Sequence, residues 1–411
     1  MLRKGLVQLI PTEYDARTGP WPRTAGLDHA LGSYLGDLAA IKRRAQLERL
    51  PLYHRIKPEL DRVLSGFAWR LDPPRPCTRA RGDVPPIQAV TWNLERGKQF
   101  EAICAVIRNE PRIHEADLLM LTELDIGMTR SGHRNVPRDL ADQMGMAYVF
   151  ANFHLVLSPG DQGERHHGEP NTAAMHGSAL LSRFPITRFA AVDLPEKIDK
   201  FHVLEKRLGC KRAILCEVST PSGLLTVVVP HLDPFADGRY RGLQMRRVLR
   251  AASDFGGDHV LLGGDLNTNT YHLGSGAGLA FNCAHKLVRL GVDRTIKQYL
   301  EPGRIFERPV FHALREGGFS TDGFNDLAKG TYHFDLRDPE IARKIQDYVP
   351  RWVQRWVNRR VAPFDGALPM RLDWFAGRGV VPSSPWVLHH PSDGGVRASD
   401  HDPLGVTVRL D

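Results

Sequence analysis

Polar side chains that could bind a cation and a phosphate stand at the ends of several apolar runs. They are acids, amides and imidazoles, and in chain order they are Asn93, Glu123, His231, Asp265, Asn267, Asp373, Asp400 and His401. Burying such groups at a strand end is costly unless each finds a partner. One case would be ordinary, but the repetition predicts that they meet in one site that holds a hard cation and a phosphate.

The carboxylates of this set can serve two purposes. Glu123 and Asp400 offer the oxygen ligands that Mg²⁺ and Mn²⁺ prefer, and Asn93 can orient a ligand water. A second kind of carboxylate must orient and deprotonate the attacking water, and Asp265 in the segment GGDLN fits because two glycines let the backbone come close. Asn267 would point the same way on an extended chain and donate to the phosphate or the water.

Two histidines add hydrogen-bond donors for a phosphate. His231 and His401 can donate to non-bridging oxygens as charge develops on them. Asp373 is a candidate partner that holds one imidazole in the correct tautomer. Geometry must decide which histidine it holds. Taken alone, each residue is better explained as a turn residue or a satisfied polar group. The ordered set favours catalysis.

Strand-like runs alternate with helical patterns from residue 87 onward. Apolar spacing typical of helices covers 98–109 and 241–255. The alternation predicts a layered α/β domain with two packed sheets covered by helices. The expected strands are 87–94, 117–122, 146–151, 177–182, 211–219, 224–230, 259–263, 371–376 and 404–410.

The chain is expected to divide near residue 86. Residues 1–86 form a basic, partly helical extension that ends in a Pro-rich linker, and residues 87–411 form the catalytic domain, with insertions near 158–176 and 272–310. The formal charge is +8, and residues 1–86 hold 15 Lys+Arg against 9 Asp+Glu. This basic excess can attract nucleic acid or an anionic membrane surface, and it equally fits a surface that only aids solubility.

Two further segments carry weaker signals. The loop 158–176 contains His166, His167 and His176, which could bind a transition metal but lack a regular ligand spacing. The segment 339–360 places Trp352 and Trp356 at helical spacing among arginines, which fits an interfacial or substrate-facing helix and, more commonly, a surface helix packed on the core. Arg130 and Arg183 could each contact a phosphate or form a structural ion pair.

Several classes of protein are disfavoured by composition. The five cysteines are scattered without a CxxC pair, which argues against a disulfide framework and a thiolate zinc site. No stretch approaches the roughly 20 apolar residues of a membrane span. The apolar part of the N-terminus, GLVQLI, is shorter than the roughly 7–15 residues of a signal sequence. These features predict a cytoplasmic protein without a transmembrane segment.

Seven short segments occur in a fixed order across residues 90–403: TWN, TELD, HGSALLSRFPI, VVVPHLDP, GGDLNT, RLDW and SDHDP. Together they resemble the endonuclease/exonuclease/phosphatase superfamily, the fold of pancreatic DNase, apurinic endonucleases, neutral sphingomyelinases and inositol-polyphosphate 5-phosphatases. The resemblance implies a four-layer α/β sandwich, with two mainly antiparallel sheets packed face to face and helices outside. The N-terminal helical extension would precede it.

The resemblance also implies a cofactor, Mg²⁺ or Mn²⁺. Glu123 matches the metal-binding glutamate of the family, and Asp400 matches its metal-associated aspartate. Asn93 matches the asparagine near the metal and the water. Mg²⁺ is the expected ion, with Mn²⁺ as the alternative.

The remaining matches concern the reaction itself. His231 matches a phosphate contact, and Asp265 with Asn267 matches the pair that positions the nucleophilic water and the phosphate. His401 matches the catalytic histidine that is paired with an aspartate, here Asp373.

We therefore expect a metal-dependent phosphoesterase that hydrolyses a phosphodiester by in-line attack of water. The substrate stays open between nucleic acid, whose binding would depend strongly on salt, and a phospholipid or sphingomyelin, which would need an apolar rim. MRLDWFAGRG lacks the Cys-Asp-Arg unit of inositol 5-phosphatases. A non-catalytic binding module on the same fold is the third alternative, and the intact polar set argues against it. The sequence does not indicate an oligomeric state.

Overall fold

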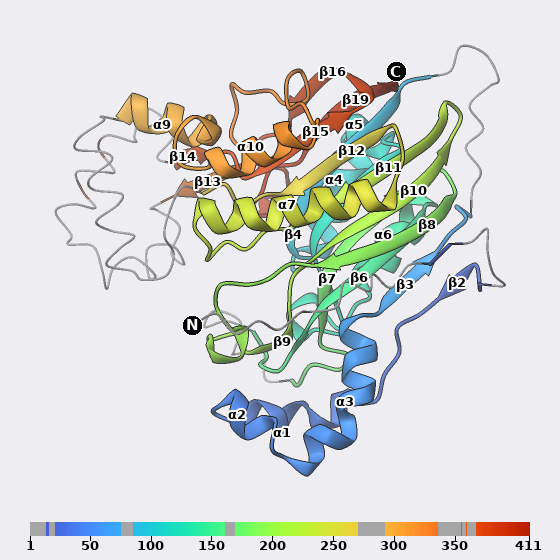
Figure 1. The fold of residues 1–411 in the computed structure, drawn as a ribbon, viewed down its shortest axis with the longest axis vertical. Coiled ribbons are helices and arrows are strands. Elements are labelled where there is room, and N and C mark those ends of the chain that lie inside the picture. The colour runs from blue at the N-terminus through green and yellow to red at the C-terminus, as the bar shows by residue number, and fades with distance from the viewer. Residues whose placement is uncertain are drawn as a thin grey trace.

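Two large β-sheets pack face to face, and helices cover their outer faces (Figure 1). This arrangement confirms the predicted α/β fold class. The computed structural model describes residues 14–15, 21–74, 85–160, 169–269, 292–335, 355, 359 and 367–411.

The first sheet contains mostly antiparallel strands, with one parallel pair, β11 and β12. In spatial order it runs β1 (Tyr14–Asp15), β8 (Ile186–Asp193), β10 (Arg212–Thr220), β11 (Gly223–Val229), β12 (Val260–Asp265) and β15 (Asp373–Arg378).

The second sheet likewise has one parallel pair, β4 and β5. Its order is β16 (Val380–Val387), β19 (Leu404–Leu410), β4 (Ile87–Arg96), β5 (Leu118–Ile126), β7 (Met175–Ser182), β6 (Ala147–Val156), β3 (Phe67–Arg70) and β2 (Thr24–Ala25), and β9 (Arg207–Gly209) pairs with β6. Two pairs of short antiparallel strands stand apart from the large sheets, β13 (Tyr332–Asp335) with β14 (Ala367–Met370) and β17 (Ser392–Asp393) with β18 (Val396–Arg397).

The α-helices lie on the outer faces and at the N-terminal end (Figure 1). They are α1 (Leu35–Ala40), α2 (Arg44–Leu47), α3 (Pro51–Leu64), α4 (Phe100–Asn109), α5 (Pro111–His114), α6 (Val136–Met144), α7 (Gly238–Phe255), α9 (Val292–Leu300) and α10 (Arg308–Glu316). Short 3₁₀ turns occur at η1 (Leu31–Tyr34), η2 (Thr129–Ser131), η4 (Lys200–His202) and η5 (Pro302–Arg304).

Apolar side chains form three layers of core that match this architecture. The central layer lies between the sheets and includes Met120, Phe189 and Phe375. A second layer joins α7 and α10 to the outer face of the first sheet, and a third joins α3, α4 and α6 to the outer face of the second. Because both faces of each sheet are covered, most strands read as continuous apolar runs rather than as alternating ones.

The residues before the expected domain boundary take part in both sheets. β1 pairs with β8 in one sheet, while β2 and β3 extend the other beside β6. Helix α3 begins with Pro51 at its first turn and buries Ile56, Leu60 and Val63, whose spacing of four and three places them on one face. The division near residue 86 stays a prediction.

Some sequence features fall outside the described residues. These are His166, His167, Trp352, Trp356, much of the Pro-rich linker and most of the second insertion. In the part of the chain that is described, no helix combines the length and apolarity needed to cross a bilayer.

Strand pairing brings the predicted site residues to one region. In the parallel pairs β4–β5 and β11–β12, the carboxyl ends of neighbouring strands point the same way, so residues at those ends become neighbours. β19 runs antiparallel to β4, with Leu404 opposite Thr91, so the segment before β19 meets the end of β4. β15 runs antiparallel to β12 and places Asp373 opposite Asp265.

Two glycines let β12 approach its neighbours closely. A Cβ atom on Gly264 would lie 2.2 Å from the carbonyl oxygen of Pro230, and one on Gly263 would lie 2.6 Å from a ring carbon of Phe375. Both distances are shorter than real contacts allow. The position of Asp265 at the end of β12 therefore depends on the absence of side chains at the two preceding residues.

We expect Gly264→Ala to lower the free energy of unfolding by about 1–3 kcal/mol, because the added methyl group must displace backbone atoms. Gly36→Ala is the matched control, since no described atom lies within 4 Å of its added Cβ atom and the residue is helical. That control should be neutral or stabilise the protein by up to about 1 kcal/mol. Urea denaturation measures both, and equal effects would contradict the close approach.

Candidate active site

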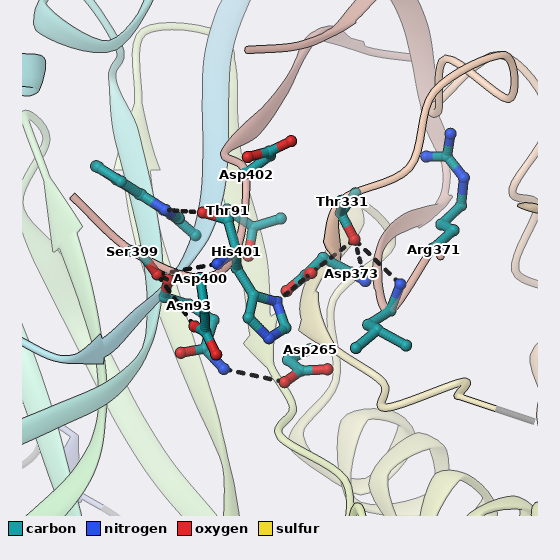
Figure 2. Close-up of polar contacts among 12 residues, drawn as sticks. Thr91, Asn93, Asp265, Thr331, Arg371, Asp373, Ser399, Asp400, His401 and Asp402 are labelled. Carbon is teal, nitrogen blue, oxygen red and sulfur yellow. Dashed lines mark hydrogen bonds and ion pairs between the residues drawn. The ribbon is translucent and has the colours of Figure 1, made fainter. Parts of the chain in front are cut away.

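The eight residues predicted from the sequence form one connected cluster at the sheet ends. Figure 2 shows five of them, contributed by β4, β12, β15 and the turn before β19 (Asn93, Asp265, Asp373, Asp400 and His401). Of the other three, His231 lies at ion-pair distance from Asp265, Asn267 donates a hydrogen bond to Asp265, and Glu123 lies at ion-pair distance from His231.

Asp265 occupies the centre of the cluster and is buried. Its Oδ2 accepts from the amide nitrogen of Asn93 at 3.0 Å and from that of Asn267 at 3.2 Å, and its Oδ1 accepts from the backbone nitrogen of Asn267 at 2.8 Å. The second amide contact of Asn267 is to the carbonyl oxygen of Leu232, at 2.9 Å. Burial and the nearby charge of Asp373 raise the pKa of Asp265 to about 7. This carboxyl group is thus rigidly oriented and unusually basic.

His401 and Asp373 form a buried pair. The Nδ1 atom of His401 lies 2.8 Å from Oδ2 of Asp373, which also accepts from the hydroxyl of Thr331 at 2.8 Å (Figure 2). Burial opposes the charged imidazole, but the carboxylate of Asp373 outweighs it, so the pKa of His401 rises well above its ordinary value. Of the two candidate histidines, Asp373 therefore holds His401, and Nε2 of His401 is the ring atom that remains for a substrate.

His231 lies between two carboxylates. Its Nε2 atom is 3.7 Å from Oε1 of Glu123 and 3.5 Å from Oδ2 of Asp265. Burial and the positive charge of Lys211 hold the pKa of His231 well below its ordinary value. The imidazole is therefore neutral near pH 7.

Three carboxylates gather at the ends of β4 and β5 and at the turn before β19. Oε2 of Glu95 accepts from the backbone nitrogen of Asp400 at 3.2 Å. Burial and then repulsion from Glu95 raise the pKa of Asp400 to about 6, with Glu123 adding to the effect. Burial would also raise the pKa of Glu123, but Arg96 and His231 hold it well below its usual range. Carboxylate oxygens that repel one another in this way suit a hard divalent cation.

Left-handed backbone conformations mark the same strand ends. Glu95, Arg96, Glu123 and Asn267 have φ values of 45°, 71°, 54° and 48°. A non-glycine residue in this region costs about 1–3 kcal/mol when the conformation is strained, and such residues concentrate at functional sites. At Asn267 the conformation is fixed by the contacts of its own amide to Asp265 and Leu232.

The turn before β19 is bound directly to β4. The indole nitrogen of Trp92 donates to the carbonyl oxygen of His401 at 2.9 Å, and the hydroxyl of Ser399 donates to the carbonyl oxygen of Asn93 at 2.6 Å. These contacts hold Asp400 and His401 against the strand that carries Asn93.

The ligand atoms of Asp265, Asp373 and His401 lie within 4.8 Å of one another. This grouping could hold a metal ion, but Oδ2 of Asp373 also accepts from Thr331, and Oδ2 of Asp265 accepts from two amides. Glu123 and Asp400, the predicted metal ligands, lie outside this grouping, and Oε1 of Glu95 accepts from Nζ of Lys98 at 2.7 Å.

The weaker sequence candidates have structural partners. Arg130 forms buried ion pairs with Asp125 and Glu205, each at 2.6 Å. Arg183 donates to backbone carbonyl oxygens before β5. His176 is buried, and its Nδ1 atom lies 2.8 Å from Asp125. These contacts account for the three residues without a bound phosphate or metal.

Four members of the site were not predicted from the sequence. Glu95 could have been found, because it is an acid only two residues after the predicted Asn93 at the same strand end. Ser399 stands directly before the predicted Asp400. Thr331 and Lys211 carry no local signal. Lys211 is buried, and its pKa falls to about 8 through burial despite attraction to Glu123 and Asp265.

With the site described, comparison with known proteins decides the family. The model described as the Endonuclease/Exonuclease/phosphatase family matches residues 90–401. The chain belongs to the endonuclease/exonuclease/phosphatase family. This confirms the resemblance carried by the ordered sequence segments. No curated protein matches the sequence significantly.

Solved structures of other proteins align over much of the chain. An endonuclease/exonuclease/phosphatase from Beutenbergia cavernae has 16% identity, covers 79% of this chain and 72% of its own, and has a TM-score of 0.45. The human Nocturnin catalytic domain with bound sulfate has 15% identity, coverage of 80% and 94%, and a TM-score of 0.46. D. rerio TDP2 complexed with single-strand DNA product has 12% identity, coverage of 79% and 99%, and a TM-score of 0.44.

The hydroxyl of Thr331 offers a test of how the His401–Asp373 pair is held. Besides donating to Asp373, it accepts from the backbone nitrogens of Leu372 and Asp373 at 3.0 and 3.1 Å. We expect Thr331→Val to lower the free energy of unfolding by about 1–3 kcal/mol, because these buried groups lose their partner.

Thr407→Val on β19 is the control, since its hydroxyl makes no side-chain hydrogen bond within the described ranges. It should stay within about 0.5 kcal/mol of the wild-type protein in denaturant unfolding. A Thr331 variant as stable as this control would contradict the structural role of the hydroxyl.

Proposed function

We propose that this chain is a divalent-metal-dependent phosphoesterase that hydrolyses a phosphodiester bond by in-line attack of water. Members of its family are generally phosphoesterase hydrolases. One observation carries the proposal: the oriented, basic carboxyl group of Asp265 lies opposite Asp373, which holds His401. A candidate base and a candidate charge-stabilising donor thus meet at one place.

Glu123 and Asp400 would hold the metal ion, with Asn93 beside it. Glu95 would support Asp400, whose backbone nitrogen donates to the Glu95 carboxylate. The fit rests on the donor chemistry, because carboxylate oxygens are the ligands that Mg²⁺ and Mn²⁺ prefer. A bound divalent cation would withdraw charge from the phosphate and stabilise the leaving oxygen.

Asp265 would act as the general base. A pKa of about 7 lets its carboxylate accept a proton from water near neutral pH, which is the range in which a base is most effective. The amides of Asn93 and Asn267 keep the carboxylate in one orientation, so the proton moves to a fixed oxygen. We infer that Asn267 positions Asp265, because its side-chain amide donates to Leu232 and to Asp265 itself.

His401 and His231 would stabilise the charge that develops on the phosphate. With Nδ1 of His401 bound to Asp373, its Nε2–H can donate to a non-bridging oxygen. His231 is neutral and donates as an imidazole. Lys211 would add a positive charge behind Glu123 and Asp265, with which it interacts electrostatically.

Asp265→Asn and His401→Ala test these roles. Each should lower the rate of Mg²⁺- or Mn²⁺-dependent hydrolysis of bis-p-nitrophenyl phosphate by at least about 10²-fold, the effect expected of a general acid or base. Asp322→Asn, a change of an exposed aspartate, is the control and should keep the wild-type rate. Circular dichroism checks the fold of each variant. Retention of activity in both site variants would sink the assignment.

A panel of phosphoesters would identify the substrate class. We propose nucleic acid and phospholipid as the two classes to compare, using DNA, RNA, sphingomyelin and inositol phosphates with each metal. Hydrolysis of nucleic acid should fall steeply with added salt, because each phosphate contact releases counterions. Hydrolysis of sphingomyelin, whose headgroup is zwitterionic and carries no net charge, should show a much weaker dependence.

A cytoplasmic location stays a prediction.

A further inference from the structure

A second cluster of metal-ligand side chains lies beside the active site. His333 of β13, His389 after β16 and Asp402 before β19 each present one ligand atom, and these atoms lie within 4.8 Å of one another. The phosphoesterase chemistry proposed above uses none of the three. Figure 2 shows Asp402 with its carboxylate directed away from the ring of His401, so the two clusters lie on different sides of the same turn.

The two oxygens of the Asp402 carboxylate contact different kinds of partner. Its Oδ2 lies 2.9 Å from Nε2 of His333 and 3.0 Å from Nδ1 of His389. Its Oδ1 accepts from the backbone nitrogen of His390 at 3.1 Å and from Nη2 of Arg397 at 3.4 Å. One oxygen is therefore anchored by the protein, while the other is faced by two imidazole nitrogens.

These distances are close to those of a loaded site. A tetrahedral zinc ion binds nitrogen and carboxylate oxygen at about 2.0–2.2 Å, which separates its ligand atoms by about 3.3–3.6 Å. The two nitrogen–oxygen distances would have to open by about 0.3–0.7 Å. Small rotations of the imidazoles would achieve this, since the three residues come from separate segments.

Burial and exposure also suit an ion that enters from solvent. The side chain of Asp402 is fully buried and that of His333 is 11% exposed, whereas that of His389 is 39% exposed. The exposed side of His389 gives an ion access and leaves room for water as a fourth ligand. Arg397 opposes a cation at this place, but its contact is with the oxygen that does not face the imidazoles.

The ligand types select the metal. Two imidazoles and one carboxylate suit Zn²⁺, whereas Mg²⁺ prefers oxygen ligands and water. The site is therefore distinct in chemistry from the carboxylates at Glu123 and Asp400. We propose that His333, His389 and Asp402 bind a zinc ion that joins β13 to the turn carrying His401.

Such an ion would act on the active site by positioning. Tyr332, next to His333, packs its ring 5.1 Å from that of His401, and Thr331 donates to Asp373. Asp402 directly follows His401 in the chain. A zinc ion bound to both His333 and Asp402 would therefore hold Tyr332 and the carboxylate of Asp373 in place beside His401. The ion itself would not contact the substrate.

Zinc binding in the presence of excess Mg²⁺ tests the proposal on the whole protein. Equilibrium dialysis at micromolar Zn²⁺, with the metal measured by mass spectrometry, should find one zinc per chain in the wild-type protein and in Glu123→Gln. The double variant His333→Ala/His389→Ala should bind at least tenfold more weakly. Co²⁺ in place of zinc should give the visible absorption of a tetrahedral ion in the wild-type protein and not in the double variant.

Two further variants keep the test decisive. His312→Ala removes an exposed imidazole that pairs with a single carboxylate, Glu316, at 3.0 Å, and it should bind zinc as the wild-type protein does. If the double variant does not fold, His389→Gln changes only the most exposed ligand and should still weaken binding at least tenfold. Wild-type affinity in the histidine variants, or no zinc bound by the wild-type protein, would overturn the site. Neither result bears on phosphoester hydrolysis, because only metal binding is measured.

Discussion

The whole site depends on two buried carboxylates that face each other across one strand pair. Asp265 and Asp373 are register partners in β12 and β15, and both are almost completely inaccessible to solvent. Burial raises the pKa of Asp265, and repulsion from the nearby carboxylate of Asp373 raises it further. The protein offsets the repulsion differently on each side, with neutral amides at Asp265 and with a charged imidazole at Asp373. In the proposed mechanism, that asymmetry lets Asp265 act as the base while Asp373 serves as the counter-ion of His401.

The strand pairings of the two sheets bring the other site residues to this pair of carboxylates. The parallel pairs bring Asn93 beside Glu123 and His231 beside Asp265, while the pairing of β19 with β4 delivers His401 from the far end of the chain. Gly263 and Gly264 have no side chains, so β12 can pack closely against Phe375 and Pro230. Each of these features is a backbone constraint, so the site is set by strand topology more than by any single side chain.

The sequence predicted the strands that carry chemistry well. Continuous apolar runs ending in a polar residue identified β4, β5, β11 and β12, because strands covered on both faces need such runs. β16 was missed since Pro382 and Pro385 interrupt it, and prolines are tolerated there because β16 lies at the edge of its sheet and pairs only with β19 in the described part of the chain. The residues alone left open whether Asp373 pairs with His401 or His231, the family resemblance implied His401, and the structure shows that contact.

Residues that act through long-range contacts left no trace in the sequence. Thr331 reaches Asp373 across 42 positions, and His333 reaches Asp402 across 69. Such contacts depend on the paired strands β13 and β14 lying against the turn before β19. No local sequence pattern predicts that arrangement. Glu95 is the exception, since its place two residues after Asn93 on the same strand would have sufficed.

The central claim is that water, activated at Asp265, attacks phosphorus. Hydrolysis of bis-p-nitrophenyl phosphate with Mn²⁺ in water enriched in ¹⁸O tests it most directly, with mass spectrometry of both products. The account predicts the label in p-nitrophenyl phosphate and none in p-nitrophenol. Label in the phenol, or no hydrolysis with either Mn²⁺ or Mg²⁺, would contradict it.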